Sequence, residues 1–380
     1  MNFHFDQDEQ DVLDMLHDFC LKEVAPIAAE IDETERFPEE TWHKLADMGM
    51  MGIAYPEEVG GAGMSYVTYI GACEELAKHC ATTSVMVSAH SSLCCWPISE
   101  YGTEAQKEKY LSKLCSGEWL GAFGLTEPGA GTDAAMQKTV AEDKGDHWVL
   151  NGSKIFITNA GFANVFVVFA MTDKSLGTKG ISAFIVERDF PGFKVGSHEK
   201  KMGIRGSSTC ELVFEDCIVP KENLLGEVGK GFKVAMTTLD GGRIGIGAQA
   251  LGIAQAAIDD TVKYTKERIQ FGKRISQFQN TQFQLADMQA KLDGARLLIY
   301  RAAQAKQDHE PYSHLAAMGK LMASEVASDV TRRALQLVGG YGYTREYPFE
   351  RFMRDAKITE IYEGTSEVQR MVISGWMGVK

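Results

Sequence analysis

The spacing of apolar residues changes twice along this chain, from a helical period to a strand period and back. Near the start, Leu16 and Cys20 belong to a series of apolar residues at three- and four-residue steps, which would line one face of a helix. A second helix is indicated between Pro38, which suits a first turn, and Gly49, which tolerates a left-handed stop. Residues 1–120 are therefore predicted to form an all-helical domain.

The middle of the chain has the pattern of β-strands. Short runs rich in Val, Ile and Phe are separated by Gly, Pro, Asp and Lys, as in Val165–Phe169 and Ile181–Val186. Asn151-Gly152 lies between two strand-like runs, which is a strong signal for a β-hairpin. Residues 121–228 are therefore predicted to form a compact β domain, a barrel or a sandwich.

After this region the helical period returns in long segments with short connections, which is typical of a helix bundle. The segments lie near residues 230–266, 279–307, 312–338 and 358–374. Residues 229–380 are predicted to form a C-terminal four-helix bundle. The predicted fold class is therefore α+β, with three domains in one protomer.

The composition argues against several classes of partner. The net charge of −13 opposes binding to nucleic acid. The eight cysteines lack CxxC spacing and the nine histidines lack HxxxH spacing, so we expect core thiols and no metal site. No apolar run approaches the ~20 residues that cross a bilayer, and the acidic opening Met1–Glu9 lacks the features of a signal or transit peptide. The sequence predicts a cytoplasmic protein, with the mature form of a processed organelle protein as the alternative.

Three local patterns could carry function. The string Gly245–Ala250 matches GxGxxA, but a dinucleotide fingerprint needs a preceding strand, so close helix packing is the better interpretation. The segment Leu125–Asp133 is either an exposed turn that presents N–H groups and hydroxyls to a ligand or a plain surface loop. Glu363 is either a solvated helix-terminal acid or, if it faces a pocket, a base whose pKa is raised by desolvation.

Eight strings occur together in one order, and together they are specific. They are Leu125–Asp133, Phe156–Asn159, Met202–Gly206, Leu239–Arg243, Glu267–Gly272, Gln336–Gly340, Met353–Lys357 and Ile361–Thr365. Over essentially the whole chain they resemble the acyl-CoA dehydrogenase family, most closely its short-chain, butyryl-CoA type members. The resemblance implies an N-terminal helical domain, a middle β domain and a C-terminal four-helix bundle, with FAD extended between domains and reaching a neighbouring subunit.

The resemblance also assigns roles to single residues, with Glu363 as the catalytic base. Around the flavin ring it places Phe123, Leu125, Thr126, Phe156 and Thr158. Around the pyrophosphate and adenosine, partly from a partner protomer, it places Arg268, Phe271, Gln279, Gln336, Gly339 and Gly340, and Thr365 and Glu367 complete the FAD site. Acyl-CoA would be contacted by Asp240, Arg243, Tyr362 and Gly364, with Thr132 near acyl-CoA or the FAD ribityl chain.

The implied reaction is removal of an α-proton by Glu363 while the β-hydrogen leaves as hydride to flavin, giving a trans-2-enoyl-CoA, or the reverse. The implied partners are an electron-transferring flavoprotein and three further copies in a homotetramer, a dimer of dimers. Two positions depart from other members. Phe156 replaces a common Trp, and Gly242 stands where some branched- and long-chain members carry the base.

Two alternatives stay open at this point. An acyl-CoA oxidase shares this core but normally has a longer C-terminal extension, and a catalytically silent FAD- or CoA-binding scaffold would keep the cofactor strings. The retained Glu363 favours an enzyme over a scaffold. Acyl chain length, a preference for aryl substrates and the physiological direction are left undecided by the sequence.

Overall fold

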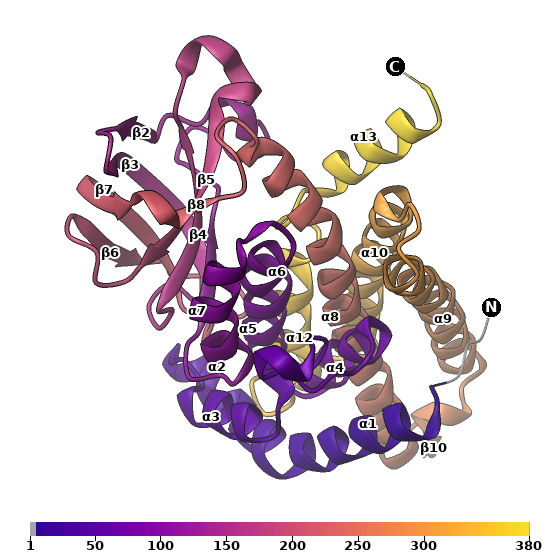
Figure 1. Ribbon diagram of the computed structural model, residues 1–380. Helices are drawn as coiled ribbons and strands as arrows, with labels where there is room; N and C mark the ends of the chain where they lie inside the picture. The colour runs from indigo at the N-terminus through magenta and orange to yellow at the C-terminus, as the bar shows by residue number, and fades with distance from the viewer. Residues whose placement is uncertain (1–4, 380) are drawn as a thin grey trace.

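The N-terminal part of the structure, a computed structural model that describes residues 5–379, is helical as predicted. Its helices are α1 (Gln7–Phe19), α2 (Ala28–Thr34), α3 (Glu39–Asp47), α4 (Tyr66–His79), α5 (Ala81–Ser88), α6 (Trp96–Tyr101) and α7 (Glu104–Cys115). Gly49 takes the expected left-handed conformation after α3, with φ of 75°. Part of the acidic opening, Met1–His4, lies outside the described residues. Figure 1 shows α5, α6 and α7 between the sheet and α8 (Gly231–Glu267), with α1 and α3 along the bottom of the view.

The middle part forms an eight-stranded sheet in the order β6-β7-β3-β2-β4-β5-β8, with β1 paired to β4. The strands are β1 (Gly121–Gly124), β2 (Val140–Asp143), β3 (His147–Thr158), β4 (Val165–Met171), β5 (Ile181–Glu187), β6 (Phe193–His198), β7 (Thr209–Pro220) and β8 (Leu224–Leu225). Aromatic rings from its two halves meet in one core, such as Trp148 against Phe184 and Phe166 against Phe193. The α+β prediction is confirmed.

The predicted hairpin at Asn151-Gly152 is wrong, because both residues lie inside the continuous strand β3. The register between β3 and β7 shifts between Leu150 and Gly152, which marks a β-bulge. Gly152 has φ of 142°, and a side chain there would lie within 2.7 Å of the Thr139 backbone. The Asn151 side chain accepts a hydrogen bond from the Asp216 N–H at 2.8 Å. The Asn-Gly pair therefore bends a strand and does not reverse the chain.

The C-terminal part is built on three long helices, α8 (Gly231–Glu267), α9 (Gln279–Gln307) and α10 (Ser313–Val338). A short hairpin of β9 (Ile269–Gln270) and β10 (Lys273–Arg274) joins α8 to α9, and α11 (Gly340–Tyr343), α12 (Phe349–Ile358) and α13 (Ser366–Trp376) follow α10. The prediction of one helix over 358–374 is wrong, because a turn separates α12 from α13. Glu363 and Gly364 occupy that turn with φ of 50° and 96°, which a helix cannot contain.

The glycines of α8 allow close packing, as predicted for Gly245–Ala250. A side chain at Gly245 would lie 2.5 Å from Ser88 Oγ, and one at Gly247 would lie 3.0 Å from Ile299 Cγ1. No strand precedes this string, which lies inside a helix of 37 residues. The eight cysteines are free and buried, as the lack of CxxC spacing indicated. Among the described helices, none is long and apolar enough to cross a membrane.

The string Met202–Gly206 joins all three parts of the chain. The Ile204 N–H donates to the buried Asp355 carboxylate at 2.5 Å, and Arg205 forms an ion pair with Glu35 at 2.7 Å. Arg354 reaches back to Asp32 on α2 with two hydrogen bonds of 2.9 and 2.6 Å. These contacts tie the β region to α2 and α12. They also bring Gly203 so close to α12 that a side chain there would lie 2.7 Å from Asp355 N.

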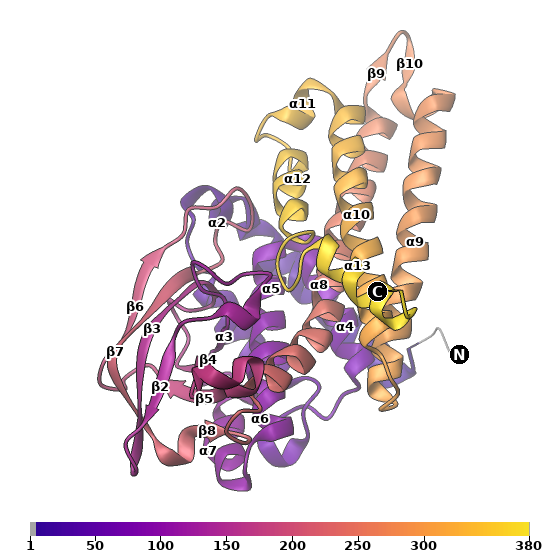
Figure 2. The same cartoon turned by 90° about the horizontal axis from the view of Figure 1, so that it is seen from above.

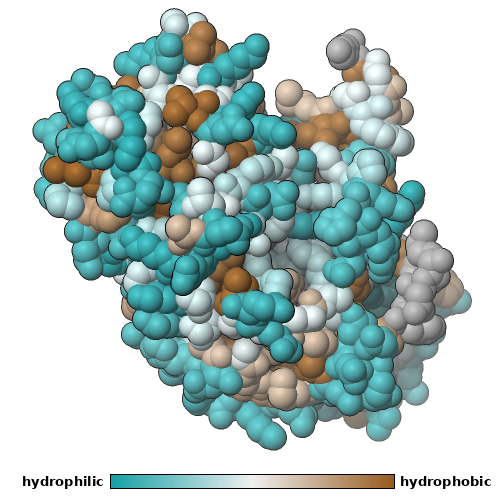
Figure 3. Space-filling model, in the orientation of Figure 1, coloured by the Kyte–Doolittle hydropathy of each residue, from teal (hydrophilic) through white to brown (hydrophobic). Residues whose placement is uncertain are grey.

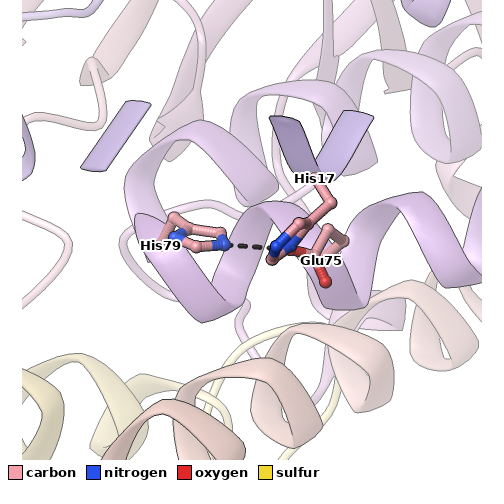
Figure 4. A group of neighbouring side chains, drawn as sticks. All are labelled: His17, Glu75 and His79. Carbon is pink, nitrogen blue, oxygen red and sulfur yellow. Dashed lines mark hydrogen bonds and ion pairs between the residues drawn. The ribbon is translucent and has the colours of Figure 1, made fainter. Parts of the chain in front are cut away.

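A second cluster links α1 to α4. His17 and His79 both approach Oε1 of Glu75, at 2.7 and 2.9 Å, as Figure 4 shows. Burial opposes ionisation of Glu75, but the hydrogen bonds from His79 and His17 outweigh it and lower the pKa of Glu75 to about 2. The three side chains are types that can bind a divalent cation. The shared carboxylate already accounts for their approach as a tether between the two helices.

We predict that Gly203→Ala lowers stability by about 1–3 kcal/mol, the usual cost of overpacking. The new methyl group would overlap the Arg354 carbonyl oxygen and lie 2.7 Å from Asp355 N, both backbone atoms. The control is Gly294→Ala, at an exposed position of α9 where a methyl group meets nothing within 4 Å. Thermal unfolding checks both variants. An unchanged midpoint in Gly203→Ala would contradict the assigned packing.

Candidate active site

Glu363 lies in the short turn between α12 and α13, where the backbone is held from both sides. The Ile361 N–H donates to Ile358 O at 2.8 Å, and the Ser366 N–H donates to Glu360 O at 2.9 Å. Thr365 caps α13, since its hydroxyl accepts a bond from the Val368 N–H at 3.4 Å. The left-handed conformation of Glu363 is uncommon for a residue with a side chain and indicates a functional constraint.

The carboxylate of Glu363 points against the backbone of α8. Its Oε2 is enclosed and has no hydrogen-bond partner among the described residues. A side chain at Gly242 would overlap that oxygen, and its Cβ would lie 2.8 Å from Leu93 Cδ2. The carboxylate therefore occupies the space that a side chain at position 242 would fill. A buried acceptor without a partner is costly and is kept where function requires it.

The environment makes Glu363 a stronger base than an ordinary carboxylate. Burial raises the pKa of Glu363 to about 7, against the opposing positive charges of Lys320 and Arg243. A carboxylate with this pKa holds a proton more tightly than an ordinary carboxylate once it has removed one, yet about half of it is ionised at pH 7. This is the range in which a general base works best.

The residues predicted to contact acyl-CoA lie beside Glu363. Asp240 and Arg243, one turn apart on α8, form an ion pair, and the Arg243 side chain is buried. The Tyr362 hydroxyl is hydrogen-bonded to Gln249 of α8. Gly364 follows the carboxylate in the same turn. The structure thus brings Arg243, Tyr362 and Gly364 next to Glu363, and Asp240 lies beside Arg243.

The loop Leu125–Asp133 is anchored by a buried ion pair that the sequence did not reveal. Lys154 of β3 is fully buried and donates to Glu127 Oε1 at 2.7 Å and to Leu125 O at 3.1 Å. Glu127 also accepts from the Thr139 N–H at 3.0 Å. A lysine inside a strand gave no signal for this role. This ion pair fixes the start of the loop. The tip of the loop presents exposed residues, among them Thr132.

The residues predicted to surround a flavin ring lie on β1, on the segment that follows β1, and on β3. Phe123 is on β1, Leu125 and Thr126 follow it, and Phe156 and Thr158 are on β3. The Ile155 N–H donates to Thr126 O at 2.9 Å, which joins the two groups. Phe156 is 58% exposed although the neighbouring aromatic rings of the domain core are buried, and its φ is 60°. An exposed aromatic ring on a strained backbone is suited to stacking against a planar ligand.

A third group of predicted cofactor residues lies elsewhere. Arg268, Phe271, Gln279, Gln336, Gly339 and Gly340 are exposed and belong to the β9–β10 hairpin and the adjoining ends of α9, α10 and α11. Figure 2 shows this end of the bundle pointing away from the sheet. The Arg268 guanidinium lies 5.5 Å from the Tyr341 ring centre, so the hairpin packs on α11. Thr365 and Glu367 lie at the start of α13, next to Glu363 instead.

Comparison with known proteins agrees with this architecture. Models of the N-terminal, middle and C-terminal domains of acyl-CoA dehydrogenase match residues 6–118, 122–217 and 229–378. The short-chain specific acyl-CoA dehydrogenase of Clostridium acetobutylicum is 59% identical over 375 residues, with 99% of both chains covered. The three matched domains correspond in order to the helical, β and helical parts of this fold, and the buried Glu363 carboxylate lies in the third. The chain belongs to the acyl-CoA dehydrogenase family.

Two solved structures are similar over nearly the whole chain. Butyryl-CoA dehydrogenase from Megasphaera elsdenii has a TM-score of 0.98 and 53% identity, with 99% of this chain and 100% of that chain covered. A chain in a structure of the electron-transferring flavoprotein of Acidaminococcus fermentans, from work on flavin-based electron bifurcation, has a TM-score of 0.98 and 54% identity, with 99% of both chains covered.

We predict that Gly242→Ala lowers kcat/KM by about 100-fold, the cost of displacing a catalytic group by ~1 Å. The methyl group would take the place of Glu363 Oε2 and press on Leu93, so the carboxylate must turn away. Steady-state kinetics of the variant test this, with Gly294→Ala as the control for adding a methyl group to a helix of the bundle. Full activity in Gly242→Ala would show that the carboxylate works from another position.

We also predict that Lys154→Met destabilises the protein by about 3–5 kcal/mol, because it leaves the Glu127 carboxylate buried without its cation. The double variant Lys154→Met/Glu127→Gln removes both charges and is expected to recover part of that loss. Thermal unfolding of Lys154→Met, Glu127→Gln, the double variant and the wild type measures the recovery. If the double variant is as unstable as the sum of the single changes, the ion pair does not anchor the loop.

Proposed function

We propose that the protein catalyses the FAD-dependent α,β-dehydrogenation of a short-chain acyl-CoA to a trans-2-enoyl-CoA, or the reverse reaction. The observation that carries this proposal is the enclosed, unpaired Glu363 carboxylate against Gly242. A carbon acid next to a thioester needs a base of raised pKa in a site that excludes water, and burial supplies both conditions. The relatives named above act on short acyl chains, including butyryl-CoA.

The turn that carries Glu363 also suits stabilisation of the thioester. A thioester carbonyl gains negative charge as the α-proton leaves, and a backbone N–H directed at its oxygen stabilises that charge. Among the described residues the Glu363 N–H donates to no backbone carbonyl, so it would be available for this role. Asp240 and Arg243 would hold the pantetheine arm, and Tyr362 and Gly364 would line the thioester site. Thr132 at the loop tip would contact acyl-CoA or the ribityl chain.

The residues on the β region fit an isoalloxazine ring. When bound there, FAD would supply the acceptor for the hydride that leaves the β-carbon. Phe156 offers an exposed aromatic face, and the hydroxyls of Thr126 and Thr158 offer polar contacts at the ring edge. Leu125 is buried and would shape the floor, and Phe123 packs on Phe169 at 5.0 Å. Thr365 and Glu367 would extend this site toward α13.

The pocket for the acyl chain is expected to be short. Beyond Gly242, α8 comes close to the preceding helices at Gly245, where a side chain would lie 2.5 Å from Ser88 Oγ and 3.4 Å from the Tyr69 hydroxyl. Both Ser88 and Tyr69 are buried. The seam between the helices is therefore filled one turn beyond the base, which leaves room for a short chain and disfavours a long or aryl one.

The exposed residues of the β9–β10 hairpin and the adjoining helix ends support a homotetramer, a dimer of dimers. Phe271 at the tip of the hairpin is 94% exposed, and Met371 and Trp376 of α13 are 67% and 59% exposed. Figure 3 shows a wide notch between the β region and α13, with apolar residues on both sides. Surfaces of this kind are typical of subunit contacts. In this arrangement Arg268, Gln279, Gln336, Gly339 and Gly340 would reach the FAD of a second copy.

The electron partner is proposed to be an electron-transferring flavoprotein, which the similarity to the Acidaminococcus fermentans chain supports. The division into domains at residues 1–120, 121–228 and 229–380 is proposed together with this function, since the FAD would lie between those parts. A cytoplasmic location stays a prediction of the sequence.

We predict that butyryl-CoA bleaches the flavin of the wild-type holoenzyme and that octanoyl-CoA does so much more slowly. In Glu363→Gln bleaching is lost, because the amide cannot accept the α-proton. The base must be ionised, and the pKa of Glu363 is raised to about 7, so kcat/KM should rise with pH through about 7 and level off above it. Stopped-flow absorbance with both acyl-CoAs and a pH series of kcat/KM measure these effects.

No bleaching with any acyl-CoA would contradict the proposed function. Bleaching that survives in Glu363→Gln would contradict only the assignment of the base. Oxygen consumption during turnover, measured without an electron-transferring flavoprotein, separates a dehydrogenase from an oxidase. We expect little oxygen consumption.

A further inference from the structure

Lys320 of α10 is a fully buried lysine that contacts the turn between α12 and α13, which carries Glu363. Its Nζ donates to the carbonyl oxygen of Gly364, the residue after Glu363, at 2.6 Å. That carbonyl also accepts a hydrogen bond from Nε2 of Gln369, itself fully buried, at 2.8 Å. Two buried donors therefore hold the Gly364 carbonyl. These hydrogen bonds stabilise the left-handed turn from which the Glu363 carboxylate reaches Gly242.

A neutral donor would be enough to hold that carbonyl, since Gln369 already does so. The ammonium of Lys320 differs from the amide of Gln369 in its charge. Burial lowers the pKa of Lys320 to about 8, and the charge of Glu363 acts in the opposite direction. At neutral pH the side chain is therefore mostly charged. A buried charge costs free energy and is usually kept where another charge requires it.

Among the charged groups around Glu363, Lys320 is the one best placed to favour its ionised form. Burial raises the pKa of Glu363, and of the two positive charges that oppose this rise Lys320 has the larger effect and Arg243 the smaller. Arg243 is already paired with Asp240 on α8. Lys320 itself also faces Glu360 and Glu367 on either side of the turn, and Arg243 from α8. From α4, Tyr66 and Cys73 face the carboxylate as neutral groups, because burial raises both their pKa values.

We propose that Lys320 is a positioning residue for the base, whose ammonium both fixes the Gly364 carbonyl and supplies the buried positive charge that lets Glu363 ionise at neutral pH. This inference rests on the proposed function, in which Glu363 removes the α-proton. Desolvation alone would make the carboxylate a strong base that keeps its proton. The neighbouring ammonium partly offsets desolvation, so that about half of the free enzyme carries an ionised base at pH 7 and most of it does at higher pH.

The experiment compares Lys320→Met with Gln369→Met. Each removes one of the two donors to the Gly364 carbonyl and substitutes a side chain of similar size, but only the first removes a charge. Lys320→Gln is made alongside, because its neutral amide keeps a donor and gives a second measurement if the Met variant does not fold. The readouts are the pH dependence of kcat/KM with butyryl-CoA and the pH dependence of flavin bleaching.

We expect the acidic limb of the pH profile to move up by about one pH unit or more in Lys320→Met and Lys320→Gln, the usual effect of a nearby opposite charge on a carboxylate. Gln369→Met is expected to lower kcat while its limb stays where it is in the wild type. An unmoved limb in the Lys320 variants, or an equal movement in Gln369→Met, would overturn the proposal.

A measurement without substrate separates this inference from the proposed function. A double-mutant cycle of Lys320→Met and Glu363→Gln, followed by thermal unfolding, should show a favourable coupling at pH 7.5 that shrinks at pH 5, where Glu363 is protonated in the native state. If no acyl-CoA bleaches the flavin but this coupling is found, the proposed function fails and the charge pairing stands. Absence of coupling at both pH values would overturn the pairing whatever the enzyme does.

Discussion

The site depends on one carboxylate placed where a side chain is missing. Glu363 Oε2 occupies the space left by Gly242 on α8, so a glycine in a long helix and an acid in a distant turn are one structural unit. This explains why α8 tolerates glycine at a position where it weakens a helix by about 1 kcal/mol relative to alanine. The left-handed backbone at Glu363 belongs to the turn from which the side chain reaches α8.

The rest of the fold holds the two sides of this contact in place. The turn of the base follows α12, and α12 is tied to the β region through Asp355 and the Ile204 N–H, and to α2 through Arg354. The β region in turn carries the loop Leu125–Asp133, fixed by the buried Lys154. The proposed flavin and the proposed base are therefore positioned by separate parts of the chain that meet at the contacts of Ile204, Asp355 and Arg354. Small changes at that junction would alter the distance between them.

Much of the architecture could be predicted from residue spacing, because burial imposes its period on helices and strands. The order of helical, β and helical parts and the packing role of Gly245–Ala250 follow from this. Local signals failed where a tertiary contact changed their meaning. Asn151-Gly152 is a strong turn signal, yet the neighbouring Thr139 and Asp216 make it a bulge inside β3. The helical period over 358–374 continued across a turn in which the Gly364 carbonyl is held by two buried donors, one of which, Lys320, is 44 residues away in sequence.

The electrostatics of the site could not be predicted from sequence either, because tertiary contacts set them. Nothing near Glu363 in the chain indicates that its pKa is raised, because the cause is enclosure by α8 and the preceding helices. Lys320 and Arg243, which oppose that effect, lie 43 and 120 residues earlier in the numbering and reach the turn only in the folded chain. A base must hold a proton strongly after taking it and yet be free of one beforehand. Desolvation serves the first requirement and the two cations serve the second, so the working pKa is a balance that only the assembled helices can set.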